Sequence, residues 1–453
     1  MEKAKYSELI NTLKPEKLPE SFPQFFEDWD GRGHMVTEEE MMGLLGRYDL
    51  PEDRVTDLKE NLKKLWENDL IVEYIKFLTY AQCDRRYDYY VEGDSIFDLK
   101  GVPGIGDKVT FYMCLSCVFH AKKELERRNI PFELYEDIPH RMLRDQMKKF
   151  AETGRYDIFD LQWKSNFYSL AIYLFDRFLF VPCKMDDPYT FYRRGAEVVG
   201  IPDAGLSVDT EGQIILQDED ETGKGQYEEE GSVVKNGYYY GAFKKDRKED
   251  FVTTKSETED EITGYRLSPC GYITKEVITL KKAEWKQIMK KGSWMLGFHI
   301  PAGEGYEPKR VRSSMLLAWD FFKKYYPEVD FKGFWSSSWL YDGRLSILLP
   351  EDSRIVRVQR QLYNYSGGWN GEMLYHELYG DRETPLSEVP QNSSLQRDVK
   401  KYFEEGKKFA EPGMVYFPEE LTKDYNNMIY ITKEDLEKQR QLFERIGLKG
   451  VGE

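Results

Sequence analysis

The sequence predicts an α+β protein, with a helical N-terminal domain followed by a mixed α/β domain that has a central, mostly antiparallel sheet. Three observations carry this prediction. Apolar residues recur at spacings of three and four through about residue 195. After Pro202 the chain changes to short alternating runs broken by Gly. A strand, a Gly-containing loop and a helix then follow one another between Trp294 and Pro327.

The N-terminal pattern is that of amphipathic helices. Between Leu58 and Tyr80, apolar residues such as Leu62 and Leu65 recur at helical spacing. Similar patterns, separated by Pro and Gly, predict further helices over 111–128, 141–152 and 163–180. We therefore expect a helical domain at 1–195, and we interpret the most apolar stretch, Ser169 to Pro182, as a buried helix because it is shorter than a bilayer span.

The remainder divides into a mixed domain at 196–430 and a C-terminal helix or tail at 431–453. Its first part, 203–264, is rich in predicted hairpins and acidic residues. The cluster from Asp218 to Glu230 is acidic enough to repel itself, as is the run from Glu257 to Glu261, so we expect solvated hairpin loops there.

Composition excludes several classes of protein. The chain has 453 residues with 65 Lys and Arg against 81 Asp and Glu, and a net charge of −16 argues against a protein that coats nucleic acid. With 32 Tyr, 26 Phe and 9 Trp it is too aromatic to be disordered. Five Cys form no disulfide framework, and the N-terminus lacks the apolar core of a signal peptide, so we expect a cytoplasmic protein without a membrane partner.

The charge is unevenly distributed. Residues 281–362 contain 15 Lys and Arg against 9 Asp and Glu, a local charge of +6, which leaves −22 for the rest of the chain. An anionic ligand is therefore expected to bind in this stretch.

The same stretch contains a pattern typical of anion sites. The apolar run Trp294 to Ile300 predicts a strand, Gly303 and Gly305 allow a close turn, and Pro308 suits the first turn of a helix. The unpaired amides of that first turn attract anions such as phosphate or pyrophosphate. We expect the ligand to contact Ala302, Gly303, Gly305, Lys309, Arg310, Arg312 and Ser313.

The order of elements around this loop resembles the core of the GNAT-like acyltransferases. A strand is predicted at Phe331 to Leu340, a short helix at Gly343 to Leu349 and a strand at Arg354 to Tyr363, with the KEVITL strand upstream. In that superfamily the loop after the fourth strand holds the pyrophosphate of acyl-coenzyme A (acyl-CoA). The next strand splays away there, and the pantetheine inserts between the two.

Several short sequence motifs resemble those of a bacterial family of acyltransferases that joins a helical N-terminal domain to a GNAT-like C-terminal domain. They are His299-Ile300-Pro301, the helix Ser314 to Phe322, Ser338-Trp339-Leu340 with Asp342, and the run Ser353 to Gln359. This resemblance implies transfer of an acyl group, acetyl in our prediction, from acyl-CoA to a small amine or hydroxyl acceptor. No metal is predicted, and the oligomeric state is not predicted.

The reaction implied by the resemblance needs a base for the acceptor and an acid for the departing thiolate. Tyr341, directly after the predicted strand end, stands where the superfamily often places that acid. His299 alternates with Gly297 on its strand and is the candidate base. Ser337, with its neighbours Ser336 and Ser338, could donate a hydrogen bond to the acyl oxygen. Packing roles remain the alternative for each.

Two other sets of residues leave alternatives open. Cys270 could accept the acyl group as a nucleophile, with His299 as its base. Cys114, Cys117 and His120 have spacings that place them on one side of a helix, where they could hold zinc, but buried helical cysteines explain the pattern better because no second CxxC supplies a fourth ligand.

Two other functions compete with catalysis. The string from Gly101 to Lys108 (GVPGIGDK) resembles the hairpin of helix-hairpin-helix DNA-binding modules, although few basic residues surround it. A GNAT-like scaffold that binds a ligand without turnover is the other alternative, because Pro301 stands where the superfamily usually has Gln or Arg before its Gly loop.

Overall fold

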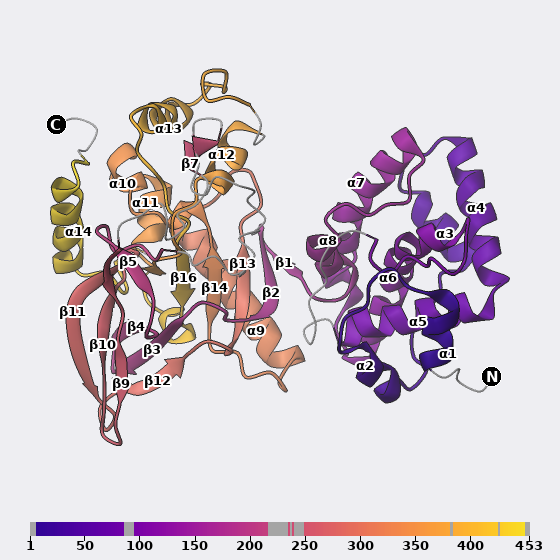
Figure 1. Ribbon diagram of the computed structural model, residues 1–453, viewed down its shortest axis with the longest axis horizontal. Coiled ribbons are helices and arrows are strands. Elements are labelled where there is room, and N and C mark those ends of the chain that lie inside the picture. The colour runs from indigo at the N-terminus through magenta and orange to yellow at the C-terminus, as the bar shows by residue number, and fades with distance from the viewer. Residues whose placement is uncertain are drawn as a thin grey trace. The chain divides into compact units, whose positions relative to one another are not determined.

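The computed structural model describes residues 6–85, 95–215, 234–235, 238–239, 249–380, 384–424 and 426–448. The chain forms two compact units. The first comprises Met1–Leu174 and Leu179–Pro182, and the second comprises Phe175–Phe178 and Cys183–Glu453 (Figure 1). The boundary predicted at residue 195 lies within the second unit.

The first unit is helical, as predicted. Its aromatic and aliphatic core includes Phe22, Phe77 and Phe111. The single helix expected over 58–80 is wrong, because Asn68 caps a new helix by accepting hydrogen bonds from the amides of Leu70 and Ile71. The helices are α1 (Tyr6–Leu13), α2 (Phe22–Asp28), α3 (Glu38–Leu45), α4 (Glu52–Trp66), α5 (Asp69–Asp84), α6 (Val109–Arg127), α7 (Asp137–Thr153) and α8 (Leu161–Tyr168).

The predicted helix over 163–180 is also wrong in its second half. Helix α8 ends at Tyr168, and strands β1 (Tyr173–Phe175) and β2 (Phe178–Lys184) follow. Leu170 and Asp176 have φ angles of 59° and 57°, a left-handed conformation that interrupts a helix. The apolar run of Tyr, Phe and Leu therefore forms strands around a turn at Asp176.

The second unit contains the predicted sheet with mostly antiparallel strands. One sheet places β13 (Trp294–His299), β14 (Phe334–Ser337), β16 (Gly413–Tyr416) and β15 (Tyr363–Tyr365) in that order. Strands β13 and β14 pair in parallel, while β14, β16 and β15 pair antiparallel. The second sheet has the order β11 (Tyr272–Lys281), β10 (Glu261–Ser268), β4 (Glu197–Pro202), β3 (Tyr189–Arg194) and β12 (Lys286–Met289).

The predicted strand and helix at the Gly loop are confirmed as β13 and α9 (Pro308–Tyr325). The strand predicted over 354–363 is wrong: Arg354–Gln359 is helix α11, because the side chain of Ser353 caps it by accepting from the amide of Val356. Only β15 follows as a strand. The remaining helices are α10 (Leu345–Leu348), α12 (Glu372–Tyr379), α13 (Ser394–Glu404) and α14 (Lys433–Arg445).

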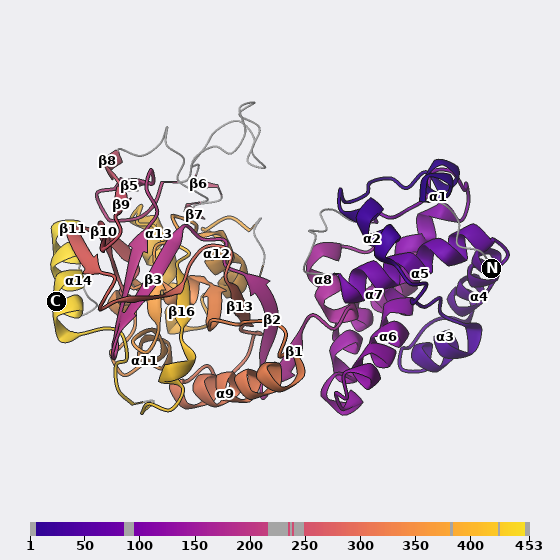
Figure 2. The ribbon, with the colours of Figure 1, turned by 90° about the horizontal axis from the view of Figure 1, so that it is seen from below.

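The two faces of the β13–β14 sheet are covered differently. Helix α9 lies on one face, where the rings of Trp319 and Phe334 are 5.9 Å apart (Figure 2). On the other face Met295 belongs to a core shared with Phe191 and Leu267 of the second sheet. Both strands next to the predicted anion site are therefore packed on both faces, which holds the loop that follows β13 in place.

The hairpin-rich segment is only partly described. Strand β5 (Ser207–Asp209) pairs with β8 (Glu249–Val252), and β9 (Lys255–Glu257) pairs with β10. The acidic run at 257–261 forms the β9–β10 turn, as expected, with the amide of Thr258 bonded to the carbonyl of Glu261. The cluster 218–230 lies outside the described residues, and β6 (Val234–Lys235) and β7 (Tyr238–Tyr239) form a short pair.

Among the described residues, no helix combines the length and the apolar character that crossing a bilayer requires.

Candidate functional site

The Gly loop joins the end of β13 to the start of α9. Gly303 and Gly305 have φ angles of 118° and 92°, which side-chain-bearing residues rarely adopt. A Cβ on Gly305 would lie 2.3 Å from Nη1 of Arg310. The sequence prediction that these glycines permit a close turn therefore agrees with the geometry of the loop.

A residue that sequence reasoning missed holds this loop. The guanidinium of Arg177, in the β1–β2 turn, donates hydrogen bonds to the carbonyl oxygens of Pro301, Gly303 and Glu304. The bond to Gly303 is 2.8 Å long. No sequence motif links Arg177 to residues more than a hundred positions later, so only the folded chain reveals it.

This arrangement orients the loop amides. In a trans peptide the N–H points away from the C=O of the same unit. With the three carbonyls turned toward Arg177, the amides of Ala302, Glu304 and Gly305 point away from it. None of these amides donates a hydrogen bond to a described residue. They form a row of donors available to an anion.

The start of α9 adds to these donors. Its N-cap residue, Glu307, makes no side-chain capping bond, so the first-turn amides of Lys309 and Arg310 remain available, while Pro308 has no N–H and the Val311 amide donates to the Glu307 carbonyl. Lys309 is exposed beside them. The Ser313 hydroxyl is exposed but donates to the carbonyl of Lys309, 2.7 Å away.

Two predicted anion-binding cations have partners inside the protein. Arg310 binds both carboxylate oxygens of Asp176 at 2.6 and 2.7 Å, and this pairing lowers the pKa of Asp176. Arg312 donates to the carbonyl oxygen of Leu421. Both side chains are only partly exposed. Their positive charges remain near the helix start, but some of their hydrogen-bond donors already bind other groups of the protein.

The parallel strands beside the loop separate toward their C-terminal ends. Leu296 pairs with Phe334 and Gly297 with Trp335, and the pairing register ends there. Strand β13 nevertheless continues to His299 and β14 to Ser337, which pairs instead with Gly413 of β16. Beyond Gly297 and Trp335 the two strands no longer pair with each other, next to the row of loop amides.

Tyr341 lies on the α9 face of these strands. It is fully buried, and burial raises its pKa while the nearby Ser336 hydroxyl lowers it by less. Tyr306, 8% exposed, is close enough that Tyr341 contributes to the increase in its pKa. Neither phenol forms a hydrogen bond of regular geometry with a described residue. Two protonated hydroxyls are therefore buried together here.

His299 and Ser337 lie on the opposite face. His299 is on the same strand face as Met295, and Ser337 is on the same strand face as Trp335. Met295 and Trp335 belong to the core against the second sheet. Burial lowers the pKa of His299 to about 4, so the imidazole is neutral at pH 7. Ser337 is exposed. The structure thus brings together two of the three predicted catalytic residues on one face and places Tyr341 on the other.

A carboxylate that sequence reasoning missed lies on the His299 face. Oδ2 of Asp187 accepts a 2.7 Å hydrogen bond from the indole of Trp335 and another from the Tyr365 hydroxyl. Burial raises the pKa of Asp187, and these two bonds lower it by less. The Asp-Asp-Pro string around it resembles an ordinary turn in sequence, so only the fold reveals this carboxylate.

Comparison with known families identifies the fold family of the second unit. Residues 221–415 match the GNAT-like C-terminal domain. The chain contains a GNAT-like C-terminal domain. The matched range includes the Gly loop, α9, β14 and Tyr341, whereas Arg177 and Asp187 precede it. The predicted layout, a helical N-terminal part followed by a GNAT-like sheet domain, is confirmed.

Comparison with curated protein sequences returned no match. Among solved structures, an acyltransferase in complex with decanoyl-CoA and teicoplanin has 16% sequence identity and a TM-score of 0.46, over 91% of this chain and 99% of that chain. A mutant acyltransferase in complex with octanoyl-CoA has the same identity and TM-score over 92% of this chain and 100% of that chain.

The GNAT-like domain buries Cys270. Its side chain is 6% exposed, and burial raises the thiol pKa to about 12. A thiol with that pKa is almost entirely protonated at pH 7, so the geometry gives no support to Cys270 as an acyl-accepting nucleophile.

The CLSCVFH set in the helical unit does not form a zinc site as a group. Cys114 and Cys117 are fully buried, and Nε2 of His120 lies 3.0 Å from a carboxylate oxygen of Asp84. In the described part of the chain, the cluster of possible metal ligands that contains His120 also contains Asp84 and Glu124 but neither cysteine. The cysteines thus take the packing role.

Two glycine amides of the helix-hairpin-helix string donate hydrogen bonds inside the protein. The amide of Gly101 donates to the carbonyl of Leu13, and that of Gly106 donates to Val102. A Cβ on Gly106 would lie 1.9 Å from the carbonyl oxygen of Leu99. These glycines allow close packing of backbone segments, which explains the motif without a phosphate.

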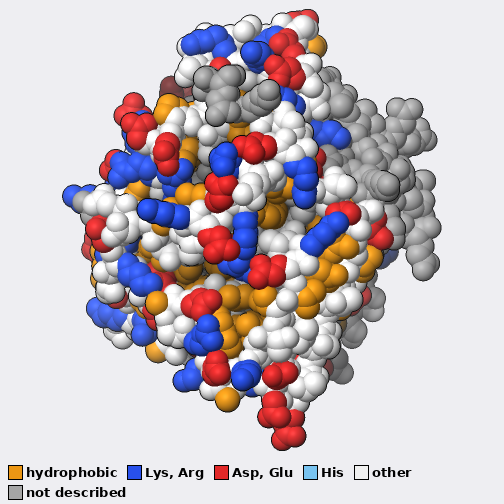
Figure 3. Space-filling view, turned by 90° about the vertical axis from the view of Figure 1, so that its left-hand side faces the viewer, with side chains coloured by type: hydrophobic (Ala, Val, Ile, Leu, Met, Phe, Trp, Pro, Cys, Tyr) orange, Lys and Arg blue, Asp and Glu red, His pale blue; other side chains and the backbone are white. Residues whose placement is uncertain are grey.

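The local charge of +6 does not produce a continuous basic patch on the face of the GNAT-like domain shown in Figure 3, where acidic and basic side chains alternate around hydrophobic ones.

Proposed function

We propose that the protein transfers an acyl group from acyl-CoA to a small amine or hydroxyl acceptor. The observation that carries the proposal is the Arg177-held Gly loop, whose outward amides lie next to the uncapped start of α9. A pyrophosphate would accept hydrogen bonds from these amides, with Lys309 beside it. The pantetheine arm would then lie where β13 and β14 separate.

In this proposal the thioester reacts between the two faces of the separated strands. A base on the His299 face takes the acceptor proton, the acceptor attacks the thioester carbonyl, and the C–S bond breaks as the tetrahedral intermediate collapses. The departing thiolate then takes a proton from a phenol on the α9 face. Tyr341 and Tyr306 can take part in this last step because a phenol is protonated at neutral pH, and burial raises the pKa of both further.

The base assignment includes Asp187 beside His299. An imidazole with a pKa of about 4 can accept a hydrogen bond from the acceptor but holds a proton weakly. The raised pKa of Asp187 makes its carboxylate a stronger base than an ordinary aspartate. Ser337, exposed on the same face, stays a predicted donor to the acyl oxygen or the acceptor.

Thiol release tests this proposal. The full-length protein is mixed with acetyl-, octanoyl- or decanoyl-CoA and a set of amine and hydroxyl acceptors, because acyl length and acceptor are both open. Tyr341→Phe should lower kcat about 10- to 100-fold with KM nearly unchanged, since the phenol acts on the leaving thiolate. The control is Tyr325→Phe, a partly exposed tyrosine at the end of α9.

The roles can be distinguished from one another. Asp187→Asn should lower kcat and change its dependence on pH, whereas wild-type kinetics in this variant would remove Asp187 from the reaction. Binding of acyl-CoA without release of thiol for any acceptor would instead support a non-catalytic scaffold.

A further inference from the structure

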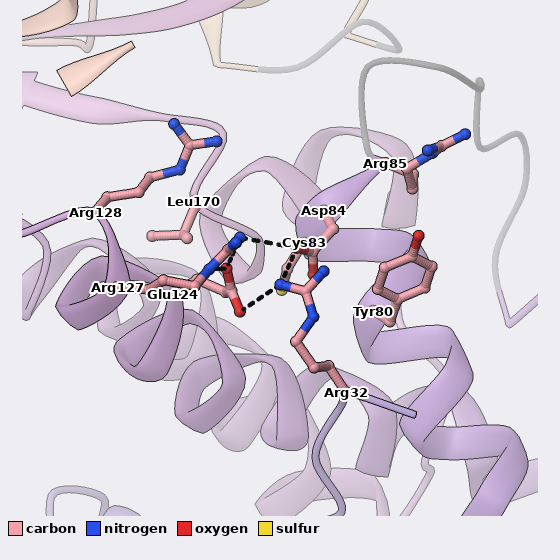
Figure 4. Close-up of a pocket in the computed structure, with 9 residues that line it drawn as sticks. All are labelled: Arg32, Tyr80, Cys83, Asp84, Arg85, Glu124, Arg127, Arg128 and Leu170. Atoms are coloured by element: carbon pink, nitrogen blue, oxygen red, sulfur yellow. Dashed lines mark hydrogen bonds and ion pairs between the residues drawn. The ribbon is translucent and has the colours of Figure 1, made fainter. Parts of the chain in front are cut away.

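The helical unit contains a polar cavity of about 210 Å³ that plays no part in the proposed acyl transfer. It lies where the C-terminal ends of α5 and α6 meet (Figure 4). Asp84 and Glu124 line it, and their carboxylate side chains are only 10% and 7% exposed. Two carboxylates this deeply buried need nearby positive charge.

His120 joins these carboxylates. It lies four positions before Glu124 on α6, so both side chains extend from the same side of the helix. Its Nε2 lies 3.0 Å from Oδ2 of Asp84. The histidine is 2% exposed, and its Nδ1 is a buried polar atom without a hydrogen-bond partner among the described residues.

The donor geometry is close to that of a metal site. One ligand atom from each of Asp84, His120 and Glu124 lies within 4.8 Å of the other two. A tetrahedral ion with bonds of about 2.0–2.2 Å separates its ligands by roughly 3.4 Å. The His120–Asp84 distance of 3.0 Å is close to this separation, and the ligand atom of Glu124 lies within 4.8 Å of both.

In the structure two arginines supply the positive charge. Figure 4 shows the guanidinium groups of Arg32 and Arg127 converging on Glu124. Arg127 donates to Oε2 of Glu124 at 2.7 Å, but its distance to Asp84 is 3.5 Å. Arg32 is 3.5 Å from both carboxylates and makes its short bond, 2.7 Å, to Asp30.

These contacts allow a metal ion to replace the guanidinium groups beside the two carboxylates. The arginine side chains are 38% and 55% exposed, so either can move into solvent at small cost. His120 Nε2 lies 3.0 Å from Asp84, whereas the guanidinium groups of Arg32 and Arg127 are each 3.5 Å from its carboxylate. A divalent cation needs to replace the tight Arg127–Glu124 bond and the hydrogen bond between His120 and Asp84.

We propose that Asp84, His120 and Glu124 bind a divalent transition-metal ion of the zinc type, in competition with the guanidinium of Arg127. Imidazole with carboxylates is a donor set that such ions accept, and the open cavity leaves a coordination position for water or another ligand. The His120 of the CLSCVFH string thus binds metal with partners other than the cysteines next to it in sequence.

Zinc titration of the chelator-treated full-length protein tests the proposal. The wild type should bind one Zn²⁺, and Co²⁺ in its place should give a visible absorption spectrum. His120→Gln should weaken Zn²⁺ binding at least tenfold. His140→Gln is the matched control, because His140 lies in the same unit but bonds to the hydroxyl of Tyr48, and it should bind Zn²⁺ like the wild type.

The arginine gives a second, opposite-signed readout. Arg127→Ala should tighten Zn²⁺ binding several-fold, since it removes the competing cation, and this variant does not depend on the folding of His120→Gln. No zinc binding by the wild type at millimolar concentration would overturn the proposal. So would equal binding by the His120→Gln and His140→Gln variants, or weaker binding in Arg127→Ala, because removal of a competing cation should not weaken zinc binding.

Discussion

Arg177 shows how one side chain can determine the chemistry of a loop. Its guanidinium gathers three carbonyl oxygens and leaves the facing amides free for a ligand. The sequence identified the glycines and the nearby cations, because their meaning is local. It could not identify Arg177 or Asp187, because both act through contacts with residues far along the chain.

Arg177→Ala is therefore expected to weaken CoA binding about tenfold, equivalent to about 1.4 kcal/mol, because the loop carbonyls lose their common donor and the amides lose their orientation. Calorimetry with CoA measures the effect. Arg194→Ala is the control, since Arg194 is paired with Glu197 and Glu284 in the β3–β4 hairpin and should leave affinity unchanged. Equal affinity in both variants would show that Arg177 does not shape the site.

Asp98 allows a prediction on pH. Burial raises its pKa from 3.8 to about 6, although Thr110 donates to it. The folded state thus binds more protons than the unfolded state between pH 4 and 6, and the free energy of unfolding falls as pH rises through that window. Asp98→Asn should remove this fall.

Urea denaturation at pH 4 and pH 7 checks the prediction. The measured quantity is the free energy of unfolding of Asp98→Asn minus that of the wild type. This difference should be about 1–2 kcal/mol more positive at pH 7 than at pH 4. The same difference at both pH values would mean that Asp98 titrates normally in the folded protein.

The strand, Gly loop and helix form the element on which the proposed function depends. The sequence predicted β13 and α9 because their apolar patterns and the proline start are local signals. It failed at α8 and α11, where Leu170 in a left-handed conformation and the Ser353 cap determined the outcome. Long apolar patterns predicted elements well, while single residues at their ends decided where each began and ended.

Gly305→Ala should damage this element in two ways. The new side chain is strained at a φ of 92°, which costs about 1–2 kcal/mol, and it displaces Arg310 from Asp176. We expect a lower melting temperature and at least tenfold weaker CoA binding. Gly43→Ala, in helix α3 where a Cβ meets nothing within 4 Å, should instead raise the melting temperature slightly. A Gly305→Ala protein with wild-type affinity would contradict the proposed loop contact.

At the scale of the whole molecule, the net charge of −16 argues against a nucleic-acid coat, and the amides of Gly101 and Gly106, which donate to backbone carbonyls, agree with that interpretation. The fold class followed from the change of pattern along the chain and is confirmed by the GNAT-like domain at 221–415. The opposition of Tyr341 to His299 and Ser337 across the sheet was not predictable, because it depends on strand register.

The central claim is that the Gly loop and the start of α9 bind the pyrophosphate of acyl-CoA. Calorimetric titration of the full-length protein with CoA and, separately, with pantetheine tests it most directly, because pantetheine retains the thiol arm but lacks the pyrophosphate. We expect binding of CoA and at least tenfold weaker binding of pantetheine. No binding of CoA at millimolar concentration, or equal binding of the two compounds, would contradict it.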